Sequence, residues 1–181
     1  MSFNIKNTSI KGVLELLCHP FLDERGSFFN IFRIQEKEFK EVWRDRSIAQ
    51  VNLSRTYNVG AIRGLHLQSS PHEEAKIIRC IKGRVWDVAV DLRLDSETYR
   101  RWFAVELNAE SCNSLLIPEG CAHGFQVLDP CSELLYLHSG RWEKESEIGI
   151  RWDDNELSIN WPLPPTDISV RDRELPYLST I

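Results

Sequence analysis

The chain has 181 residues, of which 42% are hydrophobic and 27% charged, and its formal net charge is -5 at pH 7. This length and composition fit one medium-sized domain with a substantial core, and they exclude a disulfide-stapled miniprotein or a mostly disordered chain. The acidic balance disfavours binding to nucleic acid or to an anionic membrane, which requires a basic surface, but it allows an anionic small-molecule ligand.

The elements predicted along the chain are short and mostly β. Apolar or alternating runs recur roughly every 10 residues between turn residues, which is typical of a β-sandwich or barrel. In chain order the predicted strands are 12–18, 27–33, 48–53, 61–67, 75–81, 85–92, 102–107, 115–118, 124–128 and 134–138. A short helix is predicted over 35–44, where Phe39, Val42 and Trp43 share one face. No repeat or linker is visible, so we expect a single domain over 1–181.

The strand over 85–92 has one apolar face and one small, acidic face that carries Asp87 and Asp91. Two interpretations are open. If the acidic face points into a closed sandwich, it leaves room for a ligand-sized cavity. If the strand is half-exposed, the same carboxylates face solvent.

The start of the chain and its cysteines indicate a compartment. The first seven residues lack the basic and apolar parts of a signal peptide, and no apolar run is long enough for a bilayer, so we expect a cytoplasmic protein. The five cysteines are far apart and form no CxxC pair, which favours free thiols in a reducing environment. They are Cys18, Cys80, Cys112, Cys121 and Cys131.

Two of the five histidines, His66 and His123, lie beside glycines in predicted strand segments. A histidine in a strand is more often a hydrogen-bonded core residue than a catalytic one. Their neighbours point the other way, because several motifs surround them in a fixed order. The main motifs are Arg63-Gly64-Leu65-His66-x-Gln68, Lys76, Gly83-x-Val85-x-Asp87-Val88-Ala89-Val90-Asp91-x-Arg93, Ile117-Pro118-x-Gly120-x-Ala122-His123-Gly124-Phe125 and Ser169-x-x-Asp172, and the supporting ones are Asp23-Glu24-Arg25-Gly26, Gln50-x-Asn52 and Gly149-Ile150-x-Trp152-x-Asp154.

Together these motifs resemble the dTDP-4-dehydrorhamnose 3,5-epimerases, which are cupin-fold enzymes, over almost the whole chain. The resemblance implies an all-β jelly roll (double-stranded β-helix) with a few short helices, paired as a homodimer. It also implies epimerisation of a nucleotide-linked 4-keto-6-deoxy sugar at C3, C5 or both, with neither a metal nor an organic cofactor.

The resemblance assigns four catalytic residues. His66 matches the base, and imidazole suits the task because its reference pKa of about 6.5 leaves much of it neutral at cytoplasmic pH. Asp172 matches the carboxylate that holds the imidazole in one tautomer. Lys76 matches the cation beside the sugar oxygen, where enolate charge develops. Tyr136 matches the phenol that delivers a proton to the opposite face.

The substrate-binding residues expected from the same match are Arg25, Phe28, Asn30, Gln50, Asn52, Arg63, Gln68, Asp87, His123 and Trp142. Arg25 and Arg63 suit the diphosphate, because guanidinium binds phosphate oxygens in a bidentate manner. Strict alternation puts Arg63 and His66 on opposite faces of one strand. We therefore predict a bulge at Gly64, or a face shared with a second chain.

The chain departs from the family pattern at the nucleotide position and at the rim. Asn30 stands where the family has an acidic residue that holds the nucleotide. His138 and Arg141 replace residues that follow the tyrosine, and they are expected to change the rim and the sugar or the number of inversions. Trp142 retains an aromatic ring for stacking.

Three alternatives remain open. The first is an epimerase that acts at one carbon only, with the same four catalytic residues. The second is a metal-dependent cupin oxygenase or isomerase with His66, His123 and Glu74 as ligands, although Gln68 replaces the second histidine of the usual His-x-His pair. The third is a cupin that binds sugar nucleotides without catalysis.

Overall fold

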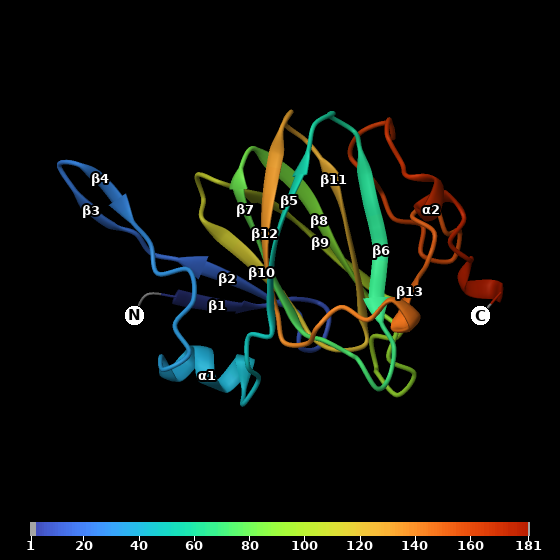
Figure 1. Ribbon diagram of the computed structural model, residues 1–181, viewed down its shortest axis with the longest axis horizontal. Helices are drawn as coiled ribbons and strands as arrows, with labels where there is room; N and C mark the ends of the chain where they lie inside the picture. Colours follow the sequence, from blue (N-terminus) through green and yellow to red (C-terminus); the bar gives the residue numbers. More distant parts are fainter. Residues whose placement is uncertain (1–2, 181) are drawn as a thin grey trace.

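Two antiparallel β-sheets face each other in the computed structural model, which describes residues 3–180 (Figure 1). The six-stranded sheet has the order β1 (Phe3–Asn7), β2 (Leu14–Cys18), β10 (Asn113–Ile117), β7 (Lys76–Lys82), β12 (Ser132–His138) and β5 (Gln50–Thr56). The five-stranded sheet has the order β13 (Glu147–Gly149), β6 (Ile62–Gln68), β11 (Cys121–Val127), β8 (Arg84–Asp91) and β9 (Trp102–Asn108). The short elements are the hairpin β3 (Phe21–Asp23) and β4 (Gly26–Phe28), the helices α1 (Lys37–Trp43) and α2 (Val170–Arg173), and the 3-10 turns Lys144–Ser146 and Leu178–Thr180. The predicted all-β class is confirmed.

The main core fills the space between the sheets. Ile78 and Leu115 come from the six-stranded sheet, and Val85 and Phe125 come from the five-stranded sheet. Burying these side chains stabilises each of them by about 1.5–3 kcal/mol relative to exposure. The inward face of β8 also carries Asp87, which is fully buried, so the interpretation with this carboxylate inside the sandwich is confirmed.

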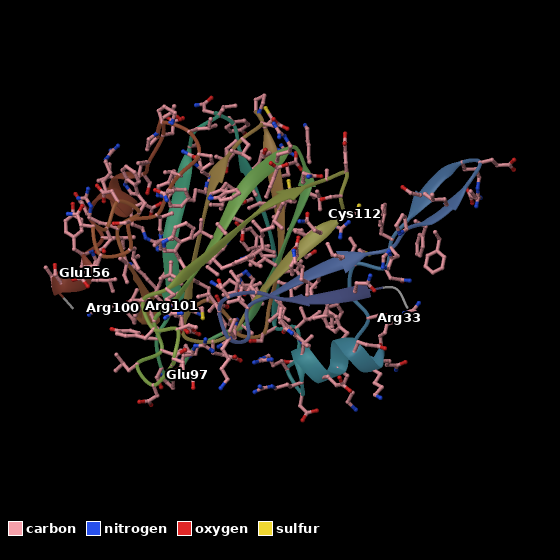
Figure 2. All side chains as sticks on the ribbon, turned by 180° about the vertical axis from the view of Figure 1, so that it is seen from behind. Arg33, Glu97, Arg100, Arg101, Cys112 and Glu156 are labelled. Carbon is pink, nitrogen blue, oxygen red and sulfur yellow. The ribbon has the colours of Figure 1, made fainter. Side chains whose placement is uncertain are left out.

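Other segments of the chain cover part of the outer face of each sheet. Helix α1 lays the buried Phe39 and Trp43 over the six-stranded sheet, as the spacing of these residues predicts. The C-terminal segment covers the five-stranded sheet through Leu157 and Leu178. Figure 2 shows Arg100 and Glu156 close together, where an ion pair ties the loop after β8 to this segment.

The predicted strand over 27–33 is wrong, because only Gly26–Phe28 is extended and paired. Its partner is β3, and the two strands form a hairpin that projects from the body (Figure 1). Cys112, labelled in Figure 2, packs with Cys18 and Phe29 near the foot of this hairpin. All five cysteines are free thiols, as predicted.

The predicted bulge at Gly64 is present in β6. Arg63 pairs with Phe125 and His66 pairs with His123, so two residues of β6 oppose the single Gly124 of β11. Gly64 has a φ of 118°, and a Cβ there would lie 2.6 Å from the Cα of Gly124. Only glycine fits this conformation and this approach. The extra residue reverses the alternation and turns Arg63 and His66 to the same side.

Between residues 3 and 180, no helix is long and apolar enough to cross a membrane.

Candidate active site

A cavity of about 980 Å³ lies between the two sheets. Strands β5, β7 and β12 line one wall, and β6, β11 and the residues around α2 line the other. The sequence-predicted residues on its lining are Gln50, Asn52, Arg63, His66, Gln68, Lys76, His123, Tyr136, Trp142 and Asp172. Residues from distant parts of the chain therefore meet in one place.

On the five-stranded wall, His66 and Asp172 form a hydrogen-bonded pair. Nε2 of His66 lies 2.7 Å from Oδ1 of Asp172, and the backbone N–H of Gly64 donates to Oδ2 at 3.2 Å. The Ser169 hydroxyl accepts from the backbone N–H of Asp172 and thereby caps α2. Burial opposes ionisation of Asp172, but the hydrogen bond and charge of His66 outweigh it and lower the pKa of the carboxyl group. An ionised Asp172 accepts the Nε2 proton and leaves Nδ1 of His66 as the basic atom.

A second imidazole and carboxylate lie deeper. Nε2 of His123 is 2.9 Å from Oδ2 of Asp87, while Oδ1 of Asp87 has no hydrogen-bond partner among the described residues. Burial raises the pKa of Asp87, although the charge and hydrogen bond of His123 act in the opposite direction. Asp87 itself does not line the cavity, and it contacts the lining through His123.

Tyr136 lies on the opposite wall from His66. Its ring meets the His123 ring edge-on at a centroid distance of 5.9 Å and stacks on the His138 ring at 5.8 Å. Burial raises the pKa of the phenol well above its ordinary value, and the smaller influence of Ser54 in the opposite direction does not reverse this. Tyr136 is therefore protonated at neutral pH and able to donate a proton.

Lys76 has a carboxylate partner that sequence reasoning missed. Its Nζ lies 3.5 Å from Oε1 of Glu74, and Oε2 of Glu74 lies 3.0 Å from Nδ1 of His138. His138 faces Lys76 directly in the register of β12 and β7. The pairing depends on this register, which no local sequence signal reveals.

Trp142 at the rim is held from several sides. Its backbone N–H donates to Oε1 of Gln50 at 3.1 Å, and its indole N–H donates to Oε2 of Glu147 at 2.8 Å. Glu147 also forms a 2.6 Å ion pair with Arg171, the residue before Asp172.

The side-chain amide of Gln68 forms hydrogen bonds within the protein. It donates to the carbonyl oxygens of His72 and Arg141 and accepts from the backbone N–H of Glu143.

Arg25, Phe28 and Asn30 do not line the cavity of their own chain. Arg25 and Phe28 belong to the β3–β4 hairpin, where Arg25 pairs with Asp23 and the Phe28 side chain is exposed. Other cations that sequence reasoning did not single out do line the cavity beside Arg63. They are Arg55, Arg171 and Arg173.

The ligands that the metal-dependent alternative requires are each paired elsewhere. His66 is bonded to Asp172, His123 to Asp87 and Glu74 to His138. Over residues 3–180, no group of three or more His, Cys, Asp or Glu side chains is placed to hold a metal ion.

The walls differ in what they offer a bound molecule. The five-stranded sheet supplies an imidazole with a fixed tautomer, and the six-stranded sheet supplies a protonated phenol and an ammonium group. A base facing an acid across one cavity can remove a proton from one face of a carbon atom and return it to the other.

Known proteins resemble the chain over nearly all of its length. The sequence profile described as dTDP-4-dehydrorhamnose 3,5-epimerase matches residues 7–180. The dTDP-4-dehydrorhamnose 3,5-epimerase of Shigella flexneri is 41% identical over 170 residues, which cover 93% of this chain and 92% of the relative. The dTDP-4-dehydrorhamnose 3-epimerase of Streptomyces niveus is 34% identical over 170 residues, covering 94% and 81%. The crystal structure of dTDP-6-deoxy-D-glucose-3,5-epimerase from Legionella pneumophila, in complex with dTDP-4-keto-L-rhamnose, matches with a TM-score of 0.92 and 36% identity over 99% of this chain and 94% of that one.

Proposed function

Because this chain belongs to the dTDP-4-dehydrorhamnose 3,5-epimerase family, we propose that it inverts C3 and C5 of a dTDP-linked 4-keto-6-deoxy sugar. It is an isomerase of nucleotide-sugar biosynthesis with the cupin fold of its relatives. The observation that carries the proposal is the position of His66 and Tyr136 on opposite walls of one cavity. Inversion at a carbon atom requires this arrangement of base and acid.

The reaction begins at the carbon next to the ketone. Nδ1 of His66 takes the proton, the electrons of the C–H bond move into the carbonyl group, and an enolate forms. Asp172 stabilises the resulting imidazolium through its 2.7 Å hydrogen bond. Lys76 stabilises the negative charge on the enolate oxygen. Tyr136 then protonates the carbon from the other face, and the ketone is restored.

Cations lining the cavity suit the diphosphate of the substrate. Arg63 is on the same side of β6 as His66 because of the bulge at Gly64, and Arg55 lies beside it. Guanidinium groups bind phosphate oxygens through paired hydrogen bonds. Trp142 offers an exposed ring at the rim, suited to stacking on a base or sugar.

Incubation with dTDP-4-keto-6-deoxy-D-glucose in deuterated water tests the proposal. Deuterium at both C3 and C5 is the expected result, and His66→Asn should abolish it while the fold is retained. His19→Asn, at an exposed histidine outside the cavity, is the matched control. Absence of label with the wild-type protein would refute catalysis on this substrate.

A single-carbon epimerase is the second candidate. The 34% identical relative from Streptomyces niveus is a 3-epimerase, and in this chain the ring of His138 stacks on Tyr136. Label at C3 alone in the same experiment would favour this candidate. The absence of a cofactor requirement stays a prediction, which full activity in excess EDTA would support.

We also propose a cytoplasmic homodimer in which the β3–β4 hairpin of each chain reaches the cavity of its partner. Phe21, Leu22 and Phe28 are 60%, 75% and 64% exposed, and an isolated two-stranded hairpin is marginally stable in water. A partner that covers these side chains would place Arg25 and Asn30 near substrate, as the resemblance implies. The five free thiols fit a reducing compartment.

Mixing two inactive variants tests the shared site. His66→Asn lacks the base, and Arg25→Ala lacks the hairpin cation. In a mixed dimer, one cavity has both an intact His66 and an intact partner Arg25. Random pairing should restore roughly a quarter of the wild-type activity. No recovery from a mixture that light scattering shows to be dimeric would refute the shared site.

A further inference from the structure

The charged side chain of Lys76 is almost fully buried. Its side chain is 8% exposed and that of Glu74 is 6% exposed. Over residues 3–180, Glu74 is the only carboxylate that forms an ion pair with the Lys76 ammonium, at 3.5 Å. Burial disfavours the charged form of an amine, and Glu74 places an opposite charge beside it.

His138 fixes the orientation of that counter-charge. An ionised carboxylate only accepts hydrogen bonds, so Nδ1 of His138 carries the proton that is donated to Oε2 of Glu74 at 3.0 Å. The other oxygen, Oε1, then faces Lys76. Burial works against ionisation of Glu74, but the hydrogen bond from His138 and the charge of Lys76 lower the pKa of the carboxyl group. The imidazole is held in turn by stacking on Tyr136.

We propose that Glu74, oriented by His138, is the positioning residue that keeps Lys76 protonated and directed toward the enolate oxygen. The inference rests on the proposed function, because it assumes that Lys76 stabilises the enolate. The Nζ–Oε1 distance of 3.5 Å is longer than an ideal charged hydrogen bond. Glu74 therefore supplies charge without using the full hydrogen-bonding capacity of the ammonium, which remains available to the substrate.

The other charged groups around Lys76 do not replace Glu74. Asp87 on β8 is bonded to His123, and burial raises the pKa of this carboxyl group. Cys121 on β11 is a neutral thiol at physiological pH, since burial raises its pKa to about 12. Strand β10 places the apolar Ile117 opposite Lys76. On β12, the titratable neighbours are His138 and Tyr136, which have been described above.

The pH dependence of kcat between pH 6 and pH 10 tests the inference in Glu74→Gln. Without the carboxylate the ammonium loses its proton more easily, so the alkaline decline of kcat should start at least about one pH unit lower than in the wild type. Beyond that point kcat should fall about tenfold per pH unit. At pH 6, where the amine is still charged, kcat should stay within about tenfold of the wild type. Glu73→Gln, at the exposed neighbouring carboxylate, should follow the wild-type profile.

A purely structural role of Glu74 would lower kcat equally at all pH values, and an alkaline decline that coincides with the wild type would overturn the inference. His138→Leu removes the donor and should also move the decline to lower pH. His138→Asn should restore the wild-type profile, because its amide N–H takes the place of Nδ1. If Glu74→Gln does not fold, Glu74→Asp provides the test, since it retains the charge and should retain the profile. A profile shifted as far as that of His138→Leu would contradict the inference.

Lys76→Met separates the two proposals. A fully active Lys76→Met would refute the enolate role of Lys76 and this inference with it. An inactive Lys76→Met together with an unshifted Glu74→Gln would overturn the counter-charge alone and leave the proposed function intact.

Discussion

Replacing Asp172 with asparagine removes one charge and reverses one hydrogen bond at almost unchanged volume. In the wild type, the backbone N–H of Gly64 donates to Oδ2 and Nε2–H of His66 donates to Oδ1. The Gly64 N–H can only donate, so it selects the amide oxygen of the new side chain and turns the NH₂ group toward His66. Nε2 must then accept, and the imidazole proton moves to Nδ1. The atom that takes the substrate proton is therefore blocked.

The size of the effect follows from losing both the tautomer and the charge that stabilises the imidazolium. By analogy with other His–Asp pairs, we expect kcat to fall about 10³–10⁴-fold, or about 4–5.5 kcal/mol, with KM nearly unchanged. Deuterium incorporation at C3 and C5 measures the loss, and Asp45→Asn at an exposed aspartate is the control. A folded Asp172→Asn variant with kcat within tenfold of the wild type would refute the role of Nδ1 as the base.

Three further predictions concern the opposite wall and the scaffold. Tyr136→Phe should retain exchange of the substrate hydrogen on the face next to His66 but slow inversion at least about 10²-fold, as product NMR would show. Because burial raises the pKa of Tyr136, the wild-type rate should show no titration of this phenol below about pH 10. Gly64→Ala places a Cβ 2.6 Å from the Cα of Gly124 at a φ of 118°; it should lower the free energy of unfolding in urea by about 3 kcal/mol. Burial opposes ionisation of Asp91, but hydrogen bonds, above all the one from Arg93, lower its pKa from 3.8 to about 2. Asp91 therefore stabilises the folded state above about pH 4 and loses this contribution as the pH falls toward 2. Asp91→Asn should remove about 2 kcal/mol of the pH dependence of the free energy of unfolding.

Unchanged inversion by Tyr136→Phe would mean that another group or water delivers the proton. A Gly64→Ala variant as stable as the wild type would show that the bulge tolerates a side chain. Identical acid-unfolding curves for Asp91→Asn and the wild type would show that ionisation of Asp91 does not contribute to the pH dependence of stability.

Most of the strands were predictable because short apolar or alternating runs lie between turn residues. Strand β8 shows this well, since its inward Val85 and Asp87 and its outward Val88 follow strict alternation. The misses are short elements stabilised by tertiary contacts. β13 has three residues and exists because it pairs with β6 beside His66. The strand predicted over 27–33 failed because the chain leaves the hairpin after Phe28.

The site was predictable where the chemistry depends on motifs and unpredictable where it depends on register. The bulge at Gly64 followed from the need to bring Arg63 and His66 to one side. Asp172 lies 106 positions from His66 along the chain, so only the family resemblance connected the two. The pair of Glu74 and His138 has no motif at all, because β7 and β12 meet only in the folded sheet.

The division of roles between the two sheets has a physical basis. A base beside an ammonium group would be a poorer base, because a nearby positive charge disfavours protonation of the imidazole. Here His66 shares its wall with Asp172, whose carboxyl group has a lowered pKa, while Lys76 lies on the other wall with Glu74. The positive charge that develops on His66 thus lies beside the carboxylate of Asp172, and the negative charge that develops on the enolate oxygen lies beside the ammonium group of Lys76. Exchanging the two carboxylates for amides should therefore give different pH dependences, with Asp172→Asn weakening the base at every pH and Glu74→Gln weakening enolate stabilisation mainly at alkaline pH.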